Sequence, residues 1–120
     1  MSVAVLFDAF IRAEYISRSL QWEIRQALVA AAANDESAAW AAVLEHCNGS
    51  VREALEWLED NDFIEYDRGG LGVRVQCRVA GQCDTCWVPV GGCTIILPDG
   101  TQVESTFDCC GWYIEDGKGD

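Results

Sequence analysis

The stretch SVREALEWLEDNDFIEYDRGGLGVRV, residues 50–75, contains the change from helical to strand periodicity that decides the fold class. Ser50 is suited to cap a helix, and Glu53 follows three residues later as in a capping box. Apolar residues then recur at helical spacing and predict one buried stripe: Val51, Ala54, Leu55 and Leu58. From Phe63 onward the periodicity changes to two, which indicates β-strands, the first at residues 63–67.

Three further helices are expected upstream of this stretch. Apolar residues recur at helical spacing over residues 3–15, 20–33 and 37–47. In the second of these helices the apolar residues share one face: Leu20, Ile24, Ala27 and Leu28. Either Asn34 or Asp35 is expected to cap the third helix.

Downstream of residue 70 the pattern predicts a small antiparallel sheet. Alternate residues of 71–79 are apolar and face one way (Val73, Val75, Cys77 and Val79), while polar residues face the other. Residues 93–107 read as two strands joined by a Pro-Asp-Gly turn, and residues 109–114 add a last short strand. Helices followed by strands predict the α+β class.

Residues 37–75 resemble the DNA-binding unit of GntR-type winged helix-turn-helix regulators. In that family a Val-Arg-Glu-Ala-Leu helix is followed by Leu-Glu, a turn into a strand and a Gly-rich wing, and residues 50–75 follow this order. Asp62 stands where the family has a Gly after the helix. The resemblance implies a helical, winged-helix-like domain at 1–75 and a Cys-rich β-hairpin extension at 76–120 packed on it.

The formal charge of −12 is distributed unevenly along the chain. Residues 35–67 contain ten of the twenty acids, with Arg52 as their one basic residue. Such an acidic field repels phosphate backbones and favours basic protein partners. A helix that reads DNA needs cations and amides toward the groove, whereas the exposed arc predicted for this helix has one Arg and four acids. The alternative is that the net charge serves only solubility.

The charge therefore predicts a small acidic binding protein that blocks a basic, nucleic-acid-binding surface of a partner protein. Phage-encoded inhibitors of host defence, including anti-CRISPR proteins, are similar in size and charge. The densest acidic run, which we call the acidic face, is the expected partner-binding site: Glu53, Glu56, Glu59, Asp60, Asp62, Glu65 and Asp67.

A winged-helix transcriptional regulator is the second hypothesis. It would read DNA as a homodimer through Arg52, Arg68 and Arg74, and it would respond to metal through its cysteines. Low-salt binding to a DNA duplex of mixed sequence distinguishes the two hypotheses, because non-specific DNA binding is mostly electrostatic.

Seven cysteines form the second chemical pattern. The spacing Cys77-x5-Cys83-x2-Cys86-x6-Cys93 offers four ligands for zinc, since a Cys-x2-Cys pair can wrap a metal ion. It also resembles the cysteine cluster of small winged-helix accessory proteins of bacterial ferrous-iron transport. Two alternatives stay open: Cys47, Cys77 and Cys93 are reduced core thiols, or a disulfide forms, with Cys83 or Cys86 as a candidate partner.

No catalytic constellation is visible in the sequence. His46 is the one histidine and neighbours Cys47, but adjacent residues on a helix point in different directions, so a nucleophile–base pair is not expected. The N-terminus lacks the basic start of a secretion signal, and no apolar run reaches membrane-spanning length. We therefore expect a non-enzymatic cytoplasmic protein.

Overall fold

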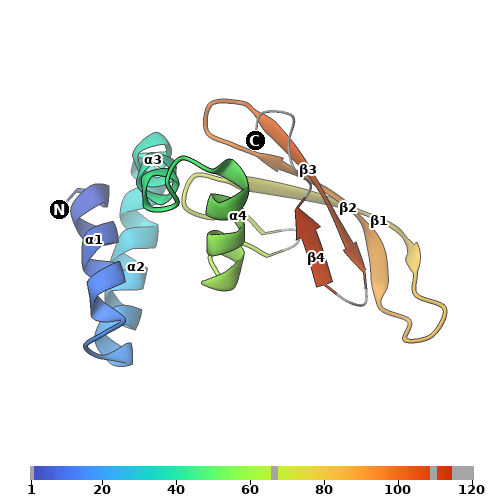
Figure 1. The fold of residues 1–120 in the computed structure, drawn as a ribbon, viewed down its shortest axis with the longest axis horizontal. Helices are drawn as coiled ribbons and strands as arrows, with labels where there is room; N and C mark the ends of the chain where they lie inside the picture. Colours follow the sequence, from blue (N-terminus) through green and yellow to red (C-terminus); the bar gives the residue numbers. More distant parts are fainter. Residues whose placement is uncertain (1, 66–67, 109–110, 115–120) are drawn as a thin grey trace.

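Four helices are followed by one antiparallel sheet (Figure 1). The computed structural model describes residues 2–65, 68–108 and 111–114. The helices are α1 (Val3–Ala13), α2 (Arg18–Asn34), α3 (Glu36–His46) and α4 (Val51–Asp60). The strands are β1 (Arg74–Gln82), β2 (Pro89–Ile96), β3 (Gln102–Asp108) and β4 (Gly111–Ile114), and they neighbour one another in this order. The α+β class is confirmed.

Each helix begins at a polar cap. The side chains of Ser2, Ser17, Asp35 and Ser50 accept a hydrogen bond from the backbone N–H three residues later. The predicted caps Asp35 and Ser50 are thus confirmed. The second helix begins two residues before the predicted residue 20, because Ser17 satisfies an N–H group of its first turn.

The chain leaves α4 through Asp62, whose φ is 60°. This left-handed conformation favours Gly and, among other residues, is most accessible to Asn and Asp. It lets the N–H of Phe63 donate to the carbonyl oxygen of Leu58 at 2.9 Å, which closes the end of the helix. Asp62 therefore forms the turn that ends α4.

The strand expected at residues 63–67 is wrong for the residues described there. Phe63 and Ile64 are buried under α4, and Glu65 makes a single bridge with Arg68. The Gly-rich segment instead reverses tightly between Gly70 and Val73. Gly72 lies against α3, since a Cβ there would come within 2.4 Å of the Glu36 carbonyl oxygen. The strand that follows, β1, pairs with β2.

The structure gives the register of the sheet. Cys77 lies opposite Cys93 in the β1–β2 pair, and Ile95 lies opposite Val103 in the β2–β3 pair. The predicted Pro-Asp-Gly turn joins β2 to β3, with Gly100 at φ 90°. The predicted last strand is β4; Cys109 and Cys110 lie outside the described residues.

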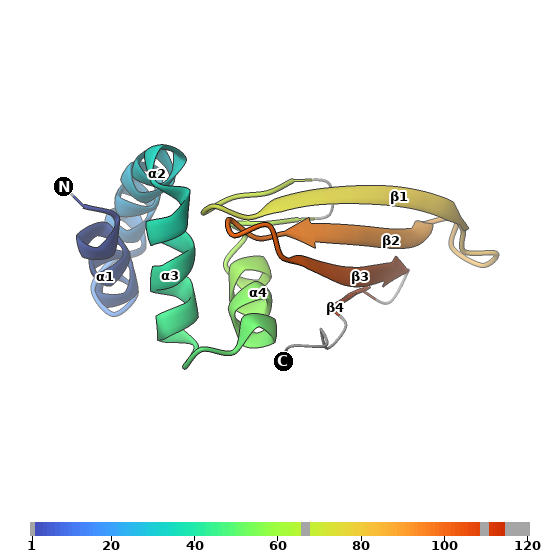
Figure 2. The ribbon, with the colours of Figure 1, turned by 90° about the horizontal axis from the view of Figure 1, so that it is seen from above.

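One continuous core joins the helices to the sheet. Figure 2 shows α4 between α3 and the sheet. The proposed domain boundary at 75/76 falls inside β1, and buried side chains on both sides of it belong to the same cluster. Its fully buried large residues come from both layers: Leu28, Val43, Leu55, Leu58, Ile64, Ile95 and Cys93. None of the described helices is long and apolar enough to cross a bilayer.

The predicted apolar face of α2 is only partly buried. Leu28 is fully buried, but Leu20 is 39% exposed and Ala27 is exposed. The helix lies at the margin of the helical layer, where α1 and α3 cover one side of it (Figure 2). Trp22 also remains 60% exposed. Helical spacing alone does not show how much of the face its neighbours cover.

Candidate functional site: an acidic face on the fourth helix

The acidic face follows the solvent side of α4 and the turn after it. Its described members are exposed, except for Glu59, which is half-buried. The opposite side of the helix buries the predicted stripe of Ala54, Leu55 and Leu58 against the core. Asp67, the last predicted member, lies outside the described residues.

The arginines proposed to read DNA lie on three different segments. Arg52 on α4 forms an ion pair with Glu56 at 3.0 Å, and Arg68 forms one with Glu65 at 3.2 Å. Arg74 is exposed at the start of β1. Two of the three guanidinium groups thus lie against carboxylates of the acidic face, which lowers their attraction for phosphate.

Two arginines bind the C-terminal end of α4. Arg25, from α2, donates to the carbonyl oxygens of Asn61 at 2.6 Å and Asp62 at 2.5 Å. Arg68 donates to the same Asp62 oxygen at 2.9 Å. These cations compensate the negative end of the helix dipole, where carbonyl groups lack helical partners.

Arg25 also stacks on the Phe63 ring, with its guanidinium carbon 4.0 Å from the ring centroid. Burial lowers the pKa of Arg25; the Asp62 carboxylate opposes this shift, and the charge of Arg68 adds to it. Sequence reasoning missed this residue. Its partners are 36 and 37 positions away, so no local pattern identifies it.

Two acids of the face lie where a helix tolerates them least. Glu59 and Asp60 are in the last turn of α4, and a negative charge there opposes the helix dipole. The pKa of Glu59 is raised, first by burial and then by the charges of Asp60 and Glu56. The ionised face is therefore under electrostatic repulsion that a nearby external cation would relieve.

The charge density of α4 is close to that of a nucleic-acid strand. Between Arg52 and Asp60 the helix has four acids and one Arg. At 1.5 Å per residue these nine positions span about 12 Å, which leaves roughly one net negative charge per 4 Å. One strand of DNA has about one charge per 3.4 Å. A basic surface that binds phosphates would meet a similar linear charge here.

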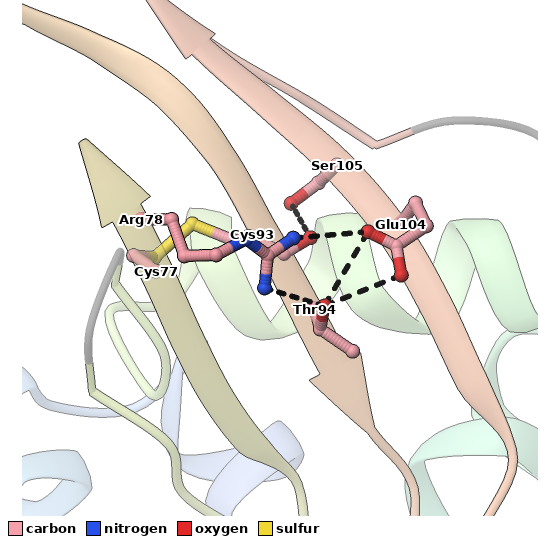
Figure 3. The surroundings of a disulfide bond; sticks show 6 residues. All are labelled: Cys77, Arg78, Cys93, Thr94, Glu104 and Ser105. Atoms are coloured by element: carbon pink, nitrogen blue, oxygen red, sulfur yellow. Dashed lines mark hydrogen bonds and ion pairs between the residues drawn. A yellow bond between two sulfur atoms is a disulfide. The ribbon is translucent and has the colours of Figure 1, made fainter. Parts of the chain in front are cut away.

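The four cysteines proposed for zinc do not meet in the sheet. Cys77 and Cys93 are joined by a disulfide between β1 and β2 (Figure 3). Cys83 follows the end of β1, and an extended strand from Cys77 to that point spans roughly 20 Å. Zinc ligands lie about 2.3 Å from the ion, so these thiols cannot share one ion in this conformation.

The alternative in which Cys77 and Cys93 are reduced core thiols is wrong for this structure, in which a disulfide joins them across β1 and β2; neither Cys83 nor Cys86 takes part in that bond. Cys47 is buried as a thiol, and burial followed by the charge of Glu53 raises its pKa. No group of three or more potential metal ligands gathers within residues 2–65, 68–108 and 111–114. Zinc binding stays a prediction that requires a reduced, rearranged hairpin.

His46 belongs to an aromatic cluster. It is exposed at the end of α3. Its ring lies edge-on to the rings of Phe7 and Trp57, with ring centroids 5.7 Å and 5.6 Å apart. Trp57 in turn stacks on Phe63 at 5.7 Å. The cluster joins α1, α3 and α4, so the histidine contributes packing.

A shallow cleft of about 450 Å³ lies between the α2–α3 junction and the β2–β3 turn, with Glu36 and Arg74 among its lining residues. It includes no described residue of the acidic face. The acidic face is thus the strongest candidate site.

Compared with models of protein families, with curated proteins and with solved structures, the chain shows no match.

Proposed function

We propose that this chain is a non-enzymatic binding protein whose acidic face covers a basic, nucleic-acid-binding surface of a partner protein. In this proposal the carboxylates of α4 occupy the positions that phosphates take in the partner's nucleic-acid complex. Inhibition of a nucleic-acid-binding defence protein, as anti-CRISPR proteins achieve it, is one setting for such an activity.

The observation that carries the proposal is the placement of Glu59 and Asp60. Both acids lie at the unfavourable end of the helix dipole, and Glu59 is partly desolvated beside two like charges. This arrangement costs stability, and Arg25 and Arg68 offset it through bonds to backbone carbonyl oxygens at the end of α4. Residues that lower stability locally are typical of binding surfaces.

Direct DNA reading, as a homodimeric and metal-responsive regulator, is the alternative proposal. The ion pairs of Arg52 and Arg68 with Glu56 and Glu65 weigh against it. The solvent side of α4, which would enter the major groove in a winged-helix regulator, is mainly acidic.

Two titrations at low salt test the proposal. Fluorescence anisotropy of a labelled DNA duplex should show no binding to this protein. A labelled nona-arginine peptide, which stands for an arginine-rich nucleic-acid-binding surface, should bind with an affinity that falls as salt rises. The protein should then displace the duplex from an unlabelled peptide–DNA complex.

The matched variants separate the acidic face from net charge. Glu56→Lys with Asp60→Lys should reduce peptide affinity at least tenfold. Asp8→Lys with Glu14→Lys changes the net charge by the same amount on and just after α1, and should change affinity less than threefold. Equal losses in the two variants would show that only net charge matters, and salt-sensitive binding of the duplex by the wild-type protein would favour the regulator.

The same proposal places the protein in the cytoplasm. Thiols stay reduced there, so the Cys77–Cys93 bond would be open in the cell. Alkylation of thiols in freshly lysed cells, followed by mass spectrometry, tests this placement. A pair that escapes alkylation because it is oxidised would indicate an oxidising compartment instead.

A further inference from the structure

The Cys77–Cys93 disulfide lies at the boundary between the buried and the projecting halves of the β1–β2 hairpin. On one side of it, Val75 is 8% exposed and Ile95 is fully buried. On the other side, Val79 is 61% exposed and Trp87 is 71% exposed. Figure 2 shows this end of the hairpin extending away from the helices.

Apart from strand pairing, Arg78 provides the described side-chain tether of the outer half of β1, because it donates to Thr94 at 3.2 Å and forms an ion pair with Glu104 at 3.6 Å. Among the described helices and strands, β1 makes close backbone contacts only with β2. The pairing is interrupted by an irregularity between Val79 and Gly81, and β2 contributes Gly91 and Gly92 to this region. Glycine weakens a strand, and beyond Gly91, where the pairing of β2 with β3 ends, the hairpin has two strands, which are marginally stable in water without a covering layer.

We propose that the Cys77–Cys93 disulfide is a redox-responsive clamp that keeps the projecting half of the hairpin, residues 78–92, in register, and that a dithiol reductant opens it. This proposal is independent of the acidic face.

Cys77 is the more accessible member of the pair, because it is half-buried whereas Cys93 is fully buried. A thiolate of the reductant attacks the Cys77 sulfur, the S–S bond breaks, and Cys93 leaves as a thiolate that takes up a proton. In the mixed disulfide the first sulfur of the reductant is bonded to Cys77. The second thiolate of the reductant then attacks that first reductant sulfur and releases Cys77 as a thiolate, which is protonated in turn. Two electrons pass to the protein, and the reductant becomes a cyclic disulfide.

The rest of the fold should tolerate this reduction. The Thr94 hydroxyl, beside Cys93, donates to Glu104 on β3 at 3.2 Å and so holds β2 to β3, whereas the bond from Arg78 on β1 to Thr94 would break as β1 separates (Figure 3). The Ser105 hydroxyl donates to the Cys93 carbonyl oxygen at 3.3 Å, and β3 pairs with β2 as far as Gly91 and Phe107. We therefore expect β1 to separate from β2 while β2 stays paired with β3.

Amide hydrogen exchange read by mass spectrometry tests the clamp on the full chain. The disulfide joins residues 16 positions apart, so its loss should increase opening of residues 78–92 roughly 100-fold. Exchange in α1–α4 should change less than threefold on addition of dithiothreitol. Removal of the reductant and re-oxidation should restore the original protection.

Two variants assign the response to this bond. Cys77→Ala with Cys93→Ala should show the open exchange pattern without reductant and no further response to it. Cys86→Ala removes an exposed thiol at the tip of the same hairpin and should respond to dithiothreitol as the wild-type protein does.

Several results would overturn the clamp. Global unfolding on reduction would show that the disulfide stabilises the whole fold and not only the projecting half of the hairpin. Unchanged protection of residues 78–92 would show that strand pairing suffices. Loss of the response in Cys86→Ala, or a disulfide that millimolar dithiothreitol cannot reduce in the folded protein, would also contradict it. Binding of the nona-arginine peptide should be the same in both redox states, which keeps this test separate from the proposed function.

Discussion

The fourth helix and the β1–β2 hairpin solve the problem of stability in opposite ways. On α4 the buried stripe anchors the helix in the core, and the exposed side concentrates negative charge. The hairpin has no acid between residues 69 and 83, extends beyond the core, and is joined by a covalent bond. Packing lets α4 tolerate a repulsive surface, whereas the hairpin depends on its disulfide and on strand pairing.

This difference shows that a binding surface and a redox-responsive segment can lie on separate parts of the molecule. A surface on a well-packed helix can lose charge without loss of fold, so its carboxylates are open to substitution. A projecting hairpin can change its order while the core stays intact. Four predictions test the comparison, from the largest expected effect to the smallest.

Leu55→Ala should lower the free energy of unfolding by about 4 kcal/mol, because Leu55 is fully buried on the core side of α4 and its truncation leaves a cavity. Unfolding in urea, followed by Trp fluorescence and by far-UV circular dichroism, should give one coincident transition. Val5→Ala, at a position 52% exposed on α1, is the control and should cost less than about 0.5 kcal/mol. Two separate transitions would contradict the continuous core.

Gly91→Ala should destabilise the sheet by about 3 kcal/mol. A Cβ at this position would lie 2.0 Å from the Arg78 carbonyl oxygen, so the two strands would have to separate. Gly81→Ala is the matched control in the same hairpin, since its nearest neighbour would be a Val90 methyl group at 4.0 Å. Thermal unfolding of both variants measures the difference, and similar melting temperatures would show that the strands adjust freely.

Arg25→Ala should cost about 2 kcal/mol, because it removes two charge-assisted hydrogen bonds at the end of α4 and the contact with Phe63. Arg12→Ala removes only an exposed ion pair with Asp8 and should cost less than about 0.5 kcal/mol. Chemical denaturation of both variants provides the measurement. If the two losses are equal, the end of α4 does not need its cationic cap.

Glu59→Gln should stabilise the protein slightly at neutral pH, by up to about 0.5 kcal/mol. Because the folded-state pKa of Glu59 is raised, the stability that this carboxyl contributes is present below its unfolded pKa and is lost as pH rises through the folded pKa. The variant's advantage should therefore disappear as pH falls through the carboxyl range.

Denaturation at several pH values measures this effect. Glu53→Gln, in the favourable first turn of α4, is the control and should not stabilise the protein. An advantage of Glu59→Gln that persists at low pH would show that the removed cost is not one of ionisation.

Much of the architecture follows from local patterns. The caps Asp35 and Ser50, the stripe on α4 and the Pro-Asp-Gly turn each depend on residues within a few positions of one another. Hydrogen bonds and side-chain periodicity at this range are properties of short segments, so the sequence predicts them. The crowded acids of α4 are visible for the same reason.

The errors occur where distant segments compete. The apolar residues at 63 and 64 pack under α4 and do not form a ladder, because burial against a helix satisfies them as well as strand pairing does. Val79 follows the apolar alternation of β1 but is exposed, since the strand continues past the end of the core. A local sequence pattern does not show how far a strand extends beyond the core that covers it.

The sequence by itself determined the α+β class, the caps of α3 and α4 and the acidic run of α4, because each depends on neighbours along the chain. Only the tertiary structure decided that Arg25 caps α4, that Cys77 pairs with Cys93, and that four candidate metal ligands lie apart. These outcomes depend on register and on packing between segments, and spacing along the chain does not specify the distances between them.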